Sequence, residues 1–284
     1  MRITVTGARG MLGRALEAAL ASEQHQLHLI DLPECDISDR EAVGACLEAF
    51  GPEAVIHAAA YTDVDGCERD PALATRVNAE GTGNVAEAAA AAGARLLYVS
   101  TDYVFDGAKR QPYTEDDEPQ PLSVYGRSKL AGEAAVRRHS ANLVVRTAWL
   151  YGAGGRHFPG AVLAQARRGE TLRVVSDQVG CPTWTRDLAR VIAALLRTPA
   201  SGVLHAAGAE SCSWYEFAAA IVEEAAARGW APRVTIQPIR SAELGWPAPR
   251  PPYSVLSTRR LEQLGITPPQ GWRRALPQFL DELA

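Results

Sequence analysis

Tyr125 and Lys129 stand four residues apart, and together they could protonate a substrate. Residues at i and i+4 share one face of a helix, so the phenol and the ammonium would lie side by side. Lysine occurs only at positions 109 and 129 among 29 basic residues, and a guanidinium does not replace its compact charge in a tight polar site. At ~5 Å and an effective dielectric constant of ~20 the attraction is ~3 kcal/mol, or roughly two pKa units. We therefore expect Lys129 to lower the pKa of Tyr125 toward the range used in general acid catalysis.

Thr101 follows an expected strand, Arg95–Ser100, and would lie at the sheet edge where parallel α/β folds bind ligands. Tyr125 comes 24 residues later, in an expected helix, Ser123–His139, that would lie alongside. Thr101 could hydrogen-bond a substrate carbonyl while Tyr125 donates a proton and a hydride arrives from a nicotinamide. Thr101 alone would indicate only a capped strand end, but with Tyr125 and Lys129 it predicts a carbonyl-reduction site.

The segment Gly7–Gly13 has a GxxGxxG spacing between an expected strand and an expected helix. Gly7 would permit the tight turn, Gly10 the approach of a pyrophosphate, and Gly13 close packing of helix on strand. The free N–H groups at the helix N-terminus would bind the phosphates. A glycine-rich turn that binds nothing is the alternative. The strand–turn–helix context favours a dinucleotide site, and the spacing favours the short-chain dehydrogenase type.

Asp31 closes the second expected strand, about 18 residues beyond the last of these glycines. A carboxylate there would accept hydrogen bonds from the adenosine ribose and repel a 2′-phosphate, which favours NADH. Arg9 could offset that repulsion for NADPH. The charges therefore leave both reduced cofactors, NADPH and NADH, open.

Strands alternate with helices through the first half of the chain, which predicts an α/β fold with a Rossmann-like doubly wound parallel sheet. Right-handed crossovers would place the C-terminal ends of the strands along one edge, where the residues above would meet. The expected strands are Arg2–Thr6, Gln26–Ile30, Ala54–His57, Arg95–Ser100 and Asn142–Thr147. The expected helices are Met11–Ser22, Asp39–Phe50, a pair within Pro71–Ala92, and Ser123–His139.

Beyond Trp149 prolines become frequent and the alternation loosens. We expect residues 1–150, with about 184–208 returning to the sheet, to form a dinucleotide-binding domain. Residues 151–183 and 209–284 would form a smaller C-terminal substrate-binding lobe. The expected elements are the helix Thr185–Arg197, the strand Gly202–Ala206 and the helix Ser213–Arg228, capped by Ser213 and Glu216.

The composition narrows the class of protein. A net charge of −4 and a pI near 5.9 argue against a nucleic-acid surface. No window approaches 18 uninterrupted apolar residues, so we expect no membrane span. The chain begins at once with strand residues, so we expect no signal peptide. Five scattered cysteines indicate reduced thiols in the cytoplasm rather than disulfides or a zinc site.

Longer motifs make the chain resemble a known family nearly from end to end. The glycine turn and the YxxxK spacing are widespread, whereas the STDYVF and DQxGxPT runs are far more specific. The chain resembles the extended short-chain dehydrogenase/reductases, most closely their dTDP-4-dehydrorhamnose reductase branch. The segments that carry the resemblance are Gly7–Gly13, 57–65 (HAAAYTDVD), 100–107 (STDYVFDG), 124–133 (VYGRSKLAGE), 146–152 (RTAWLYG), 177–183 (DQVGCPT) and 250–256 (RPPYSVL).

The resemblance implies an NAD(P)H-dependent oxidoreductase that reduces the C4 ketone of dTDP-4-dehydro-L-rhamnose to dTDP-L-rhamnose. The implied partner is a dTDP-linked nucleotide sugar. Another nucleotide-sugar 4-ketoreductase or an epimerase remains open, as does a non-catalytic NAD(P)-binding regulatory subunit. The complete set of Thr101, Tyr125 and Lys129 argues against the regulatory subunit, because a binding module has no chemical need for it.

Roles for individual residues follow from the same resemblance. Thr101, Tyr125 and Lys129 would be catalytic. The implied cofactor contacts are Gly10, Met11 and Leu12 at the pyrophosphate, Asp31 at the ribose, Asp36 and Ile37 at the adenine, and Ala60, Tyr61 and Thr62 at the nicotinamide, with Gly7, Gly13, Tyr125 and Lys129 around them. The implied substrate contacts are Thr101, Asp102 and Trp149 at the deoxysugar and Arg250 at the diphosphate.

One position departs from the family pattern. Some members form metal-bridged dimers through a glutamate directly after the third glycine, where this chain has Arg14. We therefore expect no metal site, and a monomer or a homodimer without that bridge.

Three further groups favour structural roles. We expect His57, at a strand end, to be packed or bonded to the backbone rather than to relay protons. Asp63 and Asp65 resemble a carboxylate metal pair, but a solvated loop or helix cap is the simpler interpretation. The acidic run 115–118 is expected to be a solvated loop.

Overall fold

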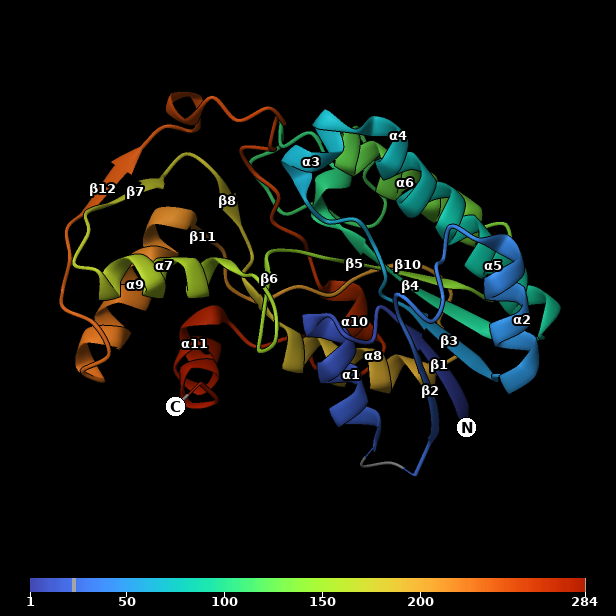
Figure 1. Cartoon of the computed structure of the whole chain (residues 1–284). Coiled ribbons are helices and arrows are strands. Elements are labelled where there is room, and N and C mark those ends of the chain that lie inside the picture. Colours follow the sequence, from blue (N-terminus) through green and yellow to red (C-terminus); the bar gives the residue numbers. More distant parts are fainter. Residues whose placement is uncertain (22–23, 284) are drawn as a thin grey trace.

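The computed structural model describes residues 1–21 and 24–283. Its central strands are β1 (Arg2–Thr6), β2 (Gln26–Ile30), β3 (Ala54–His57), β4 (Arg95–Thr101), β5 (Leu143–Thr147) and β10 (Gly202–His205). Within the described ranges these six form one parallel sheet in the order β10-β5-β4-β3-β1-β2 (Figure 1). The expected doubly wound α/β fold is confirmed. Because β2 and β3 lie on opposite sides of β1, the sheet has its switch point, and therefore its ligand crevice, at the C-terminal ends of β1 and β3.

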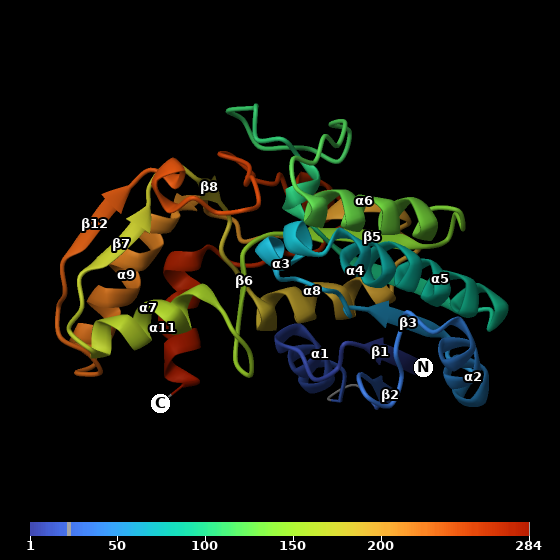
Figure 2. The ribbon, with the colours of Figure 1, turned by 45° about the horizontal axis from the view of Figure 1, so that its top comes forward.

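Helices cover both faces of this sheet (Figures 1 and 2). Helices α1 (Met11–Ala21) and α8 (Thr185–Leu196) lie on one face, and α2 (Arg40–Phe50), α5 (Thr82–Ala91) and α6 (Val124–Val136) lie on the other. Side chains alternate between the faces along a strand. In β4, Leu97 and Val99 join the core of α1 and α8, whereas Leu96 and Tyr98 join the core of α2 and α5. Apolar residues on both faces explain why these strands are continuously hydrophobic in sequence.

Strand β10 confirms the expected return of the chain to the sheet, since it pairs with β5 from Gly202 to His205. Side chains cap the starts of two helices on one face of the sheet. Asp39 accepts hydrogen bonds from two N–H groups in the first turn of α2, and Ser123 accepts one from Gly126 in α6. The expected end of the first helix, Ser22, lies outside the described residues.

The segment expected to hold a helix pair is almost continuously helical. It contains α3 (Val64–Arg69), α4 (Pro71–Thr75), a π-helical turn at Arg76–Gly81 and then α5. Asp63 caps α3 by accepting from the N–H of Gly66 at 2.8 Å, which confirms its interpretation as a cap.

The C-terminal part packs around a core of its own beside the sheet (Figure 1). Its strands are β6 (Leu150–Tyr151), β7 (Leu172–Val175), β8 (Val179–Gly180), β9 (Thr183–Trp184), β11 (Cys212–Ser213) and β12 (Ile236–Ile239). Its helices are α7 (Phe158–Arg167), α9 (Trp214–Ala227), α10 (Arg259–Gln263), which packs back against β10, and α11 (Trp272–Asp281). Ser213 and Glu216 form the expected capping box at the start of α9. Tyr151, Phe217 and Phe279 are fully buried at the centre of this core.

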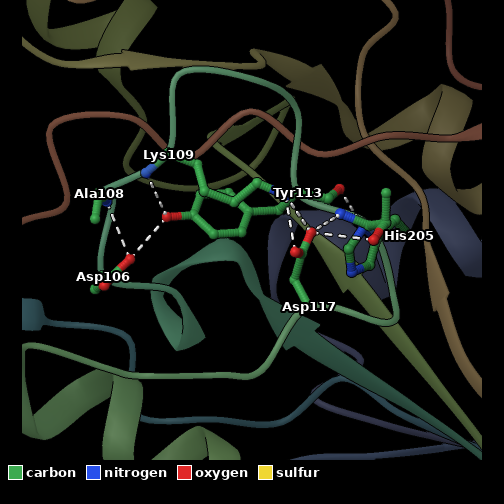
Figure 3. Close-up of polar contacts among 7 residues, drawn as sticks. Asp106, Ala108, Lys109, Tyr113, Asp117 and His205 are labelled. Carbon is green, nitrogen blue, oxygen red and sulfur yellow. Dashed lines mark hydrogen bonds and ion pairs between the residues drawn. The ribbon is translucent and has the colours of Figure 1, made fainter.

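The prediction that the acidic run 115–118 forms a uniformly solvated loop is wrong. The Glu115 side chain is only 3% exposed and accepts the backbone N–H of His205 at 3.0 Å. Asp117 accepts two hydrogen bonds from Lys109 Nζ, at 2.8 and 2.6 Å. Figure 3 shows Lys109 and Asp117 with Tyr113, whose hydroxyl donates to Asp106 and accepts from the N–H of Lys109. The acidic groups therefore fasten the 106–118 loop to the sheet and to itself.

Two absences concern only the part of the chain that is described. No helix there is long and apolar enough to cross a bilayer. The five cysteines are all free thiols.

Candidate active site

The glycine turn between β1 and α1 has the geometry that dinucleotide phosphates require. Gly7 has φ +70°, in the left-handed region that favours glycine. A Cβ on Gly13 would lie 2.3 Å from the Gly7 carbonyl oxygen, so only glycine lets the helix approach the strand this closely. The first turn of α1 carries no acidic side chain, which leaves its N–H groups and positive dipole end for an anion.

Asp31 follows β2 and is fixed by the backbone. Its two carboxylate oxygens accept the N–H groups of Arg9 and Leu32, both at 2.8 Å. The Arg9 guanidinium donates to the Leu32 carbonyl and pairs with Glu34. The cation that could have offset the charge of Asp31 is therefore already paired with a second carboxylate.

A cavity of about 780 Å³ runs along the C-terminal edge of the sheet. The residues of the cofactor and sugar hypotheses that line it are Gly7, Gly10, Met11, Leu12, Gly13, Asp31, Asp36, Ile37, Ala60, Thr62, Thr101, Asp102, Tyr125, Lys129 and Trp149. Tyr61 and Arg250 are not among its lining residues. The structure thus brings the glycine turn and the three expected catalytic side chains together in one space.

Tyr61 is held by a residue that the sequence gave no reason to select. Asn78 is 1% exposed in the π-helical turn. Its amide accepts the N–H of Tyr61 at 2.8 Å and donates to the carbonyl of Tyr61 and to Ser128 Oγ, both at 3.0 Å. Asn78 therefore joins the 60–62 segment to the helix that carries Tyr125 and Lys129.

The catalytic candidates come from two adjacent elements. Thr101 ends β4, while Tyr125 and Lys129 lie one turn apart near the start of α6. Gly126 lets α6 approach the end of β4, because a Cβ there would lie 2.2 Å from the Tyr103 carbonyl oxygen. Lys129 is 3% exposed; its Nζ donates to the Val99 carbonyl at 2.8 Å and lies 4.2 Å from the centre of the Tyr98 ring.

The predicted direction of the Tyr125 pKa is wrong. Burial raises the pKa of Tyr125, and a hydrogen bond with Thr101 opposes this rise only in part. Burial also lowers the pKa of Lys129 to about 7, with Glu133 acting in the opposite direction. Loss of water around each group dominates its pKa, and Lys129 is not among the groups that shift the pKa of Tyr125. Tyr125 is therefore a fully protonated phenol at neutral pH.

Asp102 is a buried carboxyl beside these groups. It is 2% exposed, and burial raises its pKa to about 7 although Ser254 and Thr101 donate hydrogen bonds to it. Thr101 Oγ1 donates to Oδ1 of Asp102 at 3.1 Å, and Ser254 Oγ donates to Oδ2. Thr101 Oγ1 also accepts the N–H of Tyr103 at 3.1 Å.

A buried ion pair supports the site from beneath. Arg146 on β5 donates to both carboxylate oxygens of Glu133 on α6, at 2.9 and 2.7 Å, and Ser100 Oγ donates to the same carboxylate at 2.6 Å. All three residues are at most 3% exposed. Sequence reasoning missed this pair, although Glu133 stands four residues after Lys129, on the same helix face. Removal of one partner would leave an uncompensated buried charge.

Trp149 marks the side of the cavity that faces the C-terminal lobe. Its φ is +46°, unusual for a bulky residue. Its ring stacks on Trp214, with centroids 3.4 Å apart and planes 3° from parallel. A Cβ on Gly180 would lie 2.3 Å from the Trp149 indole, which explains the glycine in the DQVGCPT segment.

Arg250 lies away from the main cavity, beside a second one of about 310 Å³ that Tyr103, Gln178, Trp214 and Trp246 also line. Its guanidinium makes a bidentate pair with Asp65, at 3.0 and 2.8 Å, and lies 4.0 Å from the Trp246 ring centre. Asp65 is thus the partner of an arginine 185 residues away, which the local sequence does not indicate. Among the described residues, no group of three or more His, Cys, Asp and Glu side chains could hold a metal ion.

His57 is packed, as expected. It is fully buried between Thr6 and Thr82, whose hydroxyls lie 2.6 and 3.1 Å from its two ring nitrogens. Burial lowers its pKa to about 3, so the ring stays neutral.

Several known proteins are similar to this chain in sequence and in architecture. A dTDP-4-dehydrorhamnose reductase of Mycolicibacterium smegmatis is 44% identical, over 97% of this chain and 84% of that protein. A probable dTDP-4,6-dihydroxy-2-methyloxan-3-one 4-ketoreductase of Streptomyces antibioticus is 41% identical, over 100% of this chain and 96% of that protein. A crystal structure of dTDP-4-dehydrorhamnose reductase from Bacillus anthracis in complex with NADP superposes with a TM-score of 0.94 at 37% identity, covering 99% of each chain. The RmlD substrate binding domain family matches residues 1–284; the chain belongs to this family, as its motifs predicted.

Proposed function

We propose that this chain reduces the C4 ketone of dTDP-4-dehydro-L-rhamnose to dTDP-L-rhamnose, using NADPH or NADH. The observation that supports this most strongly is the presence of Thr101, Tyr125 and Lys129 in the same cavity as the glycine turn. The named relatives support an NAD(P)H-dependent reductase acting on a dTDP-linked sugar. The closely packed Gly7 and Gly13 fit a bound dinucleotide at that turn.

The residues of this chain supply orientation and a proton. When bound, the reduced nicotinamide supplies the hydride. Thr101 would hydrogen-bond the ketone oxygen, and Tyr125, which burial keeps protonated, would donate its proton to that oxygen. Lys129, fixed by the Val99 carbonyl, would present its remaining hydrogen-bond donors one helical turn from the phenol.

The other contacts are proposed on the lining of the cavity. Gly10, Met11 and Leu12 would hold the pyrophosphate, Asp31 the ribose, Asp36 and Ile37 the adenine, and Ala60 and Thr62 the nicotinamide. Asp102 and Trp149 would contact the deoxysugar. A diphosphate contact by Arg250 would be made from the second cavity, where Asp65 already holds the guanidinium.

We further propose the division into a dinucleotide-binding domain, 1–150 with 184–208, and a substrate lobe. The five free thiols support a location of the enzyme in the cytoplasm, where thiols stay reduced. A monomer or homodimer without a metal bridge fits Arg14, whose Nε donates to the Arg9 carbonyl at 3.1 Å. Sedimentation with and without Mg²⁺ tests that point, and a Mg²⁺-dependent dimer would contradict it.

A second candidate is a 4-ketoreductase for another dTDP-deoxysugar, which the Streptomyces antibioticus relative favours. The test is an absorbance assay at 340 nm with enzymatically made dTDP-4-keto sugars and each reduced cofactor. We expect one cofactor oxidised per sugar, fastest with the L-rhamnose precursor. Faster turnover of another sugar selects the second candidate, and no stoichiometric cofactor loss contradicts both.

A further inference from the structure

The active site contains the carboxyl group of Asp102, which so far has no role in the transfer of the hydride or the proton. Asp102 is buried, and none of the described hydrogen bonds to it comes from a cation: the donors are the hydroxyls of Thr101 and Ser254 and the backbone N–H groups of Asp102 and Tyr103. Burying a charged carboxylate without a cationic partner is costly. A role for the protonated form of Asp102 would explain why this carboxyl group is buried in the active site.

A chain of hydroxyl groups joins this carboxyl to the proposed proton donor. Thr101 Oγ1 lies 3.1 Å from Oδ1 of Asp102, and the Thr101 side chain is also hydrogen-bonded to Tyr125. One hydroxyl can donate one hydrogen bond and accept two. Since Tyr103 N–H occupies one acceptor position of Thr101, the other can accept from a protonated Asp102 while Thr101 donates to Tyr125.

We infer that Asp102 is the proton reservoir of the enzyme, returning through Thr101 the proton that Tyr125 loses in each turnover. The inference deepens the proposed reduction and rests on it. Ketone reduction uses one hydride and one proton, and the proton leaves Tyr125 as a phenolate. The Thr101 hydroxyl proton then moves to the phenolate oxygen, and the Asp102 proton moves to Thr101. Asp102 becomes a carboxylate and regains its proton from water in the cavity, which it lines.

The direction of transfer follows from the acidities. Burial raises the pKa of Asp102 to about 7 and that of Tyr125 above its usual value near 10. A carboxylic acid near 7 protonates such a phenolate downhill. The titratable groups on the surrounding elements that respond to Asp102 are Tyr103, Tyr125 and Cys181. Their pKa values are all raised, so each is neutral at pH 7.

The decisive variant is Asp102→Asn, which keeps the shape and the acceptor oxygen but carries no acidic proton. Tyr125 already holds one proton, so a first turnover, measured by stopped flow with enzyme in excess and saturating sugar, should lose only what the altered sugar contact costs, far less than the steady-state rate loses. Steady-state turnover should fall by about 10²-fold, the usual contribution of a positioned proton donor. Equal losses in both measurements would indicate a sugar contact only and overturn the relay, as would an unchanged steady-state rate.

The pH profile gives an independent readout that a purely structural role would not move. Wild-type kcat should decline as the pH rises through about 7, because only protonated Asp102 can donate. Lys129, which lines the same cavity, also has a pKa of about 7, so its titration should remain in Asp102→Asn, whereas the part of the decline due to Asp102 should be lost. Ser254 lowers the pKa of Asp102, so Ser254→Ala should move the decline to higher pH. An unmoved profile in Ser254→Ala overturns the relay even if Asp102→Asn fails to fold. Lack of wild-type turnover with every dTDP-4-keto sugar would instead contradict the proposed function.

Discussion

The two lysines of this chain each stand four residues from a tyrosine, and the two pairs have opposite properties. Lys109 and Tyr113 lie in the 106–118 loop, where the ammonium is bound by Asp117 and the hydroxyl by Asp106 (Figure 3). The Lys109 side chain is 37% exposed. Lys129 is 3% exposed and donates to a backbone carbonyl. Water and a carboxylate stabilise the first ammonium, whereas the second is desolvated, which lowers its pKa to about 7. The four-residue spacing alone does not distinguish a structural lysine–tyrosine pair from a catalytic one. The burial of the lysine without a carboxylate bonded to it does.

The largest difference is expected between the two phenols. Tyr125→Phe should retain cofactor binding yet lose at least ~100-fold in turnover, because the proton donor is gone. Tyr113→Phe removes hydrogen bonds to Asp106 and to the N–H of Lys109 and should cost about 1–2 kcal/mol of unfolding free energy with unchanged turnover. Steady-state kinetics and thermal melts of both variants measure this. Near-normal turnover of Tyr125→Phe would remove Tyr125 from the mechanism.

Exchange of lysine for arginine should separate the two ammonium groups. Lys129→Arg should lose about tenfold or more in kcat, because the wider guanidinium does not fit between the Val99 carbonyl and the Tyr98 ring. Lys109→Arg should keep full activity, since Asp117 can pair with either cation. Matched kcat and KM measurements test the pair. A fully active Lys129→Arg enzyme would show that charge alone suffices there.

Stability should depend on pH through Lys129. Its pKa is about 7 in the folded chain and near 10.4 when unfolded. Between these values the unfolded state binds more protons, so stability rises with pH by up to ~1.4 kcal/mol per unit. Lys129→Met should abolish that rise in urea titrations from pH 7 to 10. Lys109→Met, which loses a partly exposed ion pair, should cost under about 1 kcal/mol and leave the slope in place. An identical slope in wild type and Lys129→Met would contradict the buried, neutralised lysine.

The smallest effect is expected at the adenosine end, where the charges are also paired or fixed. Asp31→Ala should move cofactor preference toward NADPH by a few-fold, because a carboxylate that repels a 2′-phosphate is lost. Glu34→Gln should act in the same direction by releasing Arg9 from its ion pair. The ratio of kcat/KM for the two cofactors measures both. An unaltered ratio in Asp31→Ala would count against a ribose role.

Local patterns in the sequence predicted much of the fold. The strands Arg2–Thr6, Gln26–Ile30 and Ala54–His57 lie where their apolar runs predicted, and the sheet is parallel and doubly wound. These features depend on periodicity and turn chemistry, which neighbouring residues determine. The glycine turn, Thr101, Tyr125 and Lys129 were likewise selected from spacing and context, and they line one cavity.

What the sequence did not reveal depends on contacts between distant residues. The Asp65–Arg250 pair joins positions 185 residues apart. The hydrogen bonds by which Asn78 holds Tyr61 are not indicated by any pattern in the local sequence. The acidity of Tyr125 was predicted in the wrong direction because a helical spacing carries no information about burial. Desolvation depends on the whole fold, and here it decides the protonation of both Tyr125 and Asp102.

The most direct test of the proposed reduction follows the transferred hydrogen. Wild-type enzyme would be supplied with a dTDP-4-keto sugar and NADPH carrying deuterium at the nicotinamide C4 position that is transferred. One deuterium is expected in each product molecule, at C4 of the sugar, by mass spectrometry and NMR. Product formed without deuterium at C4, or sugar recovered with its ketone intact while the cofactor is unchanged, would contradict it.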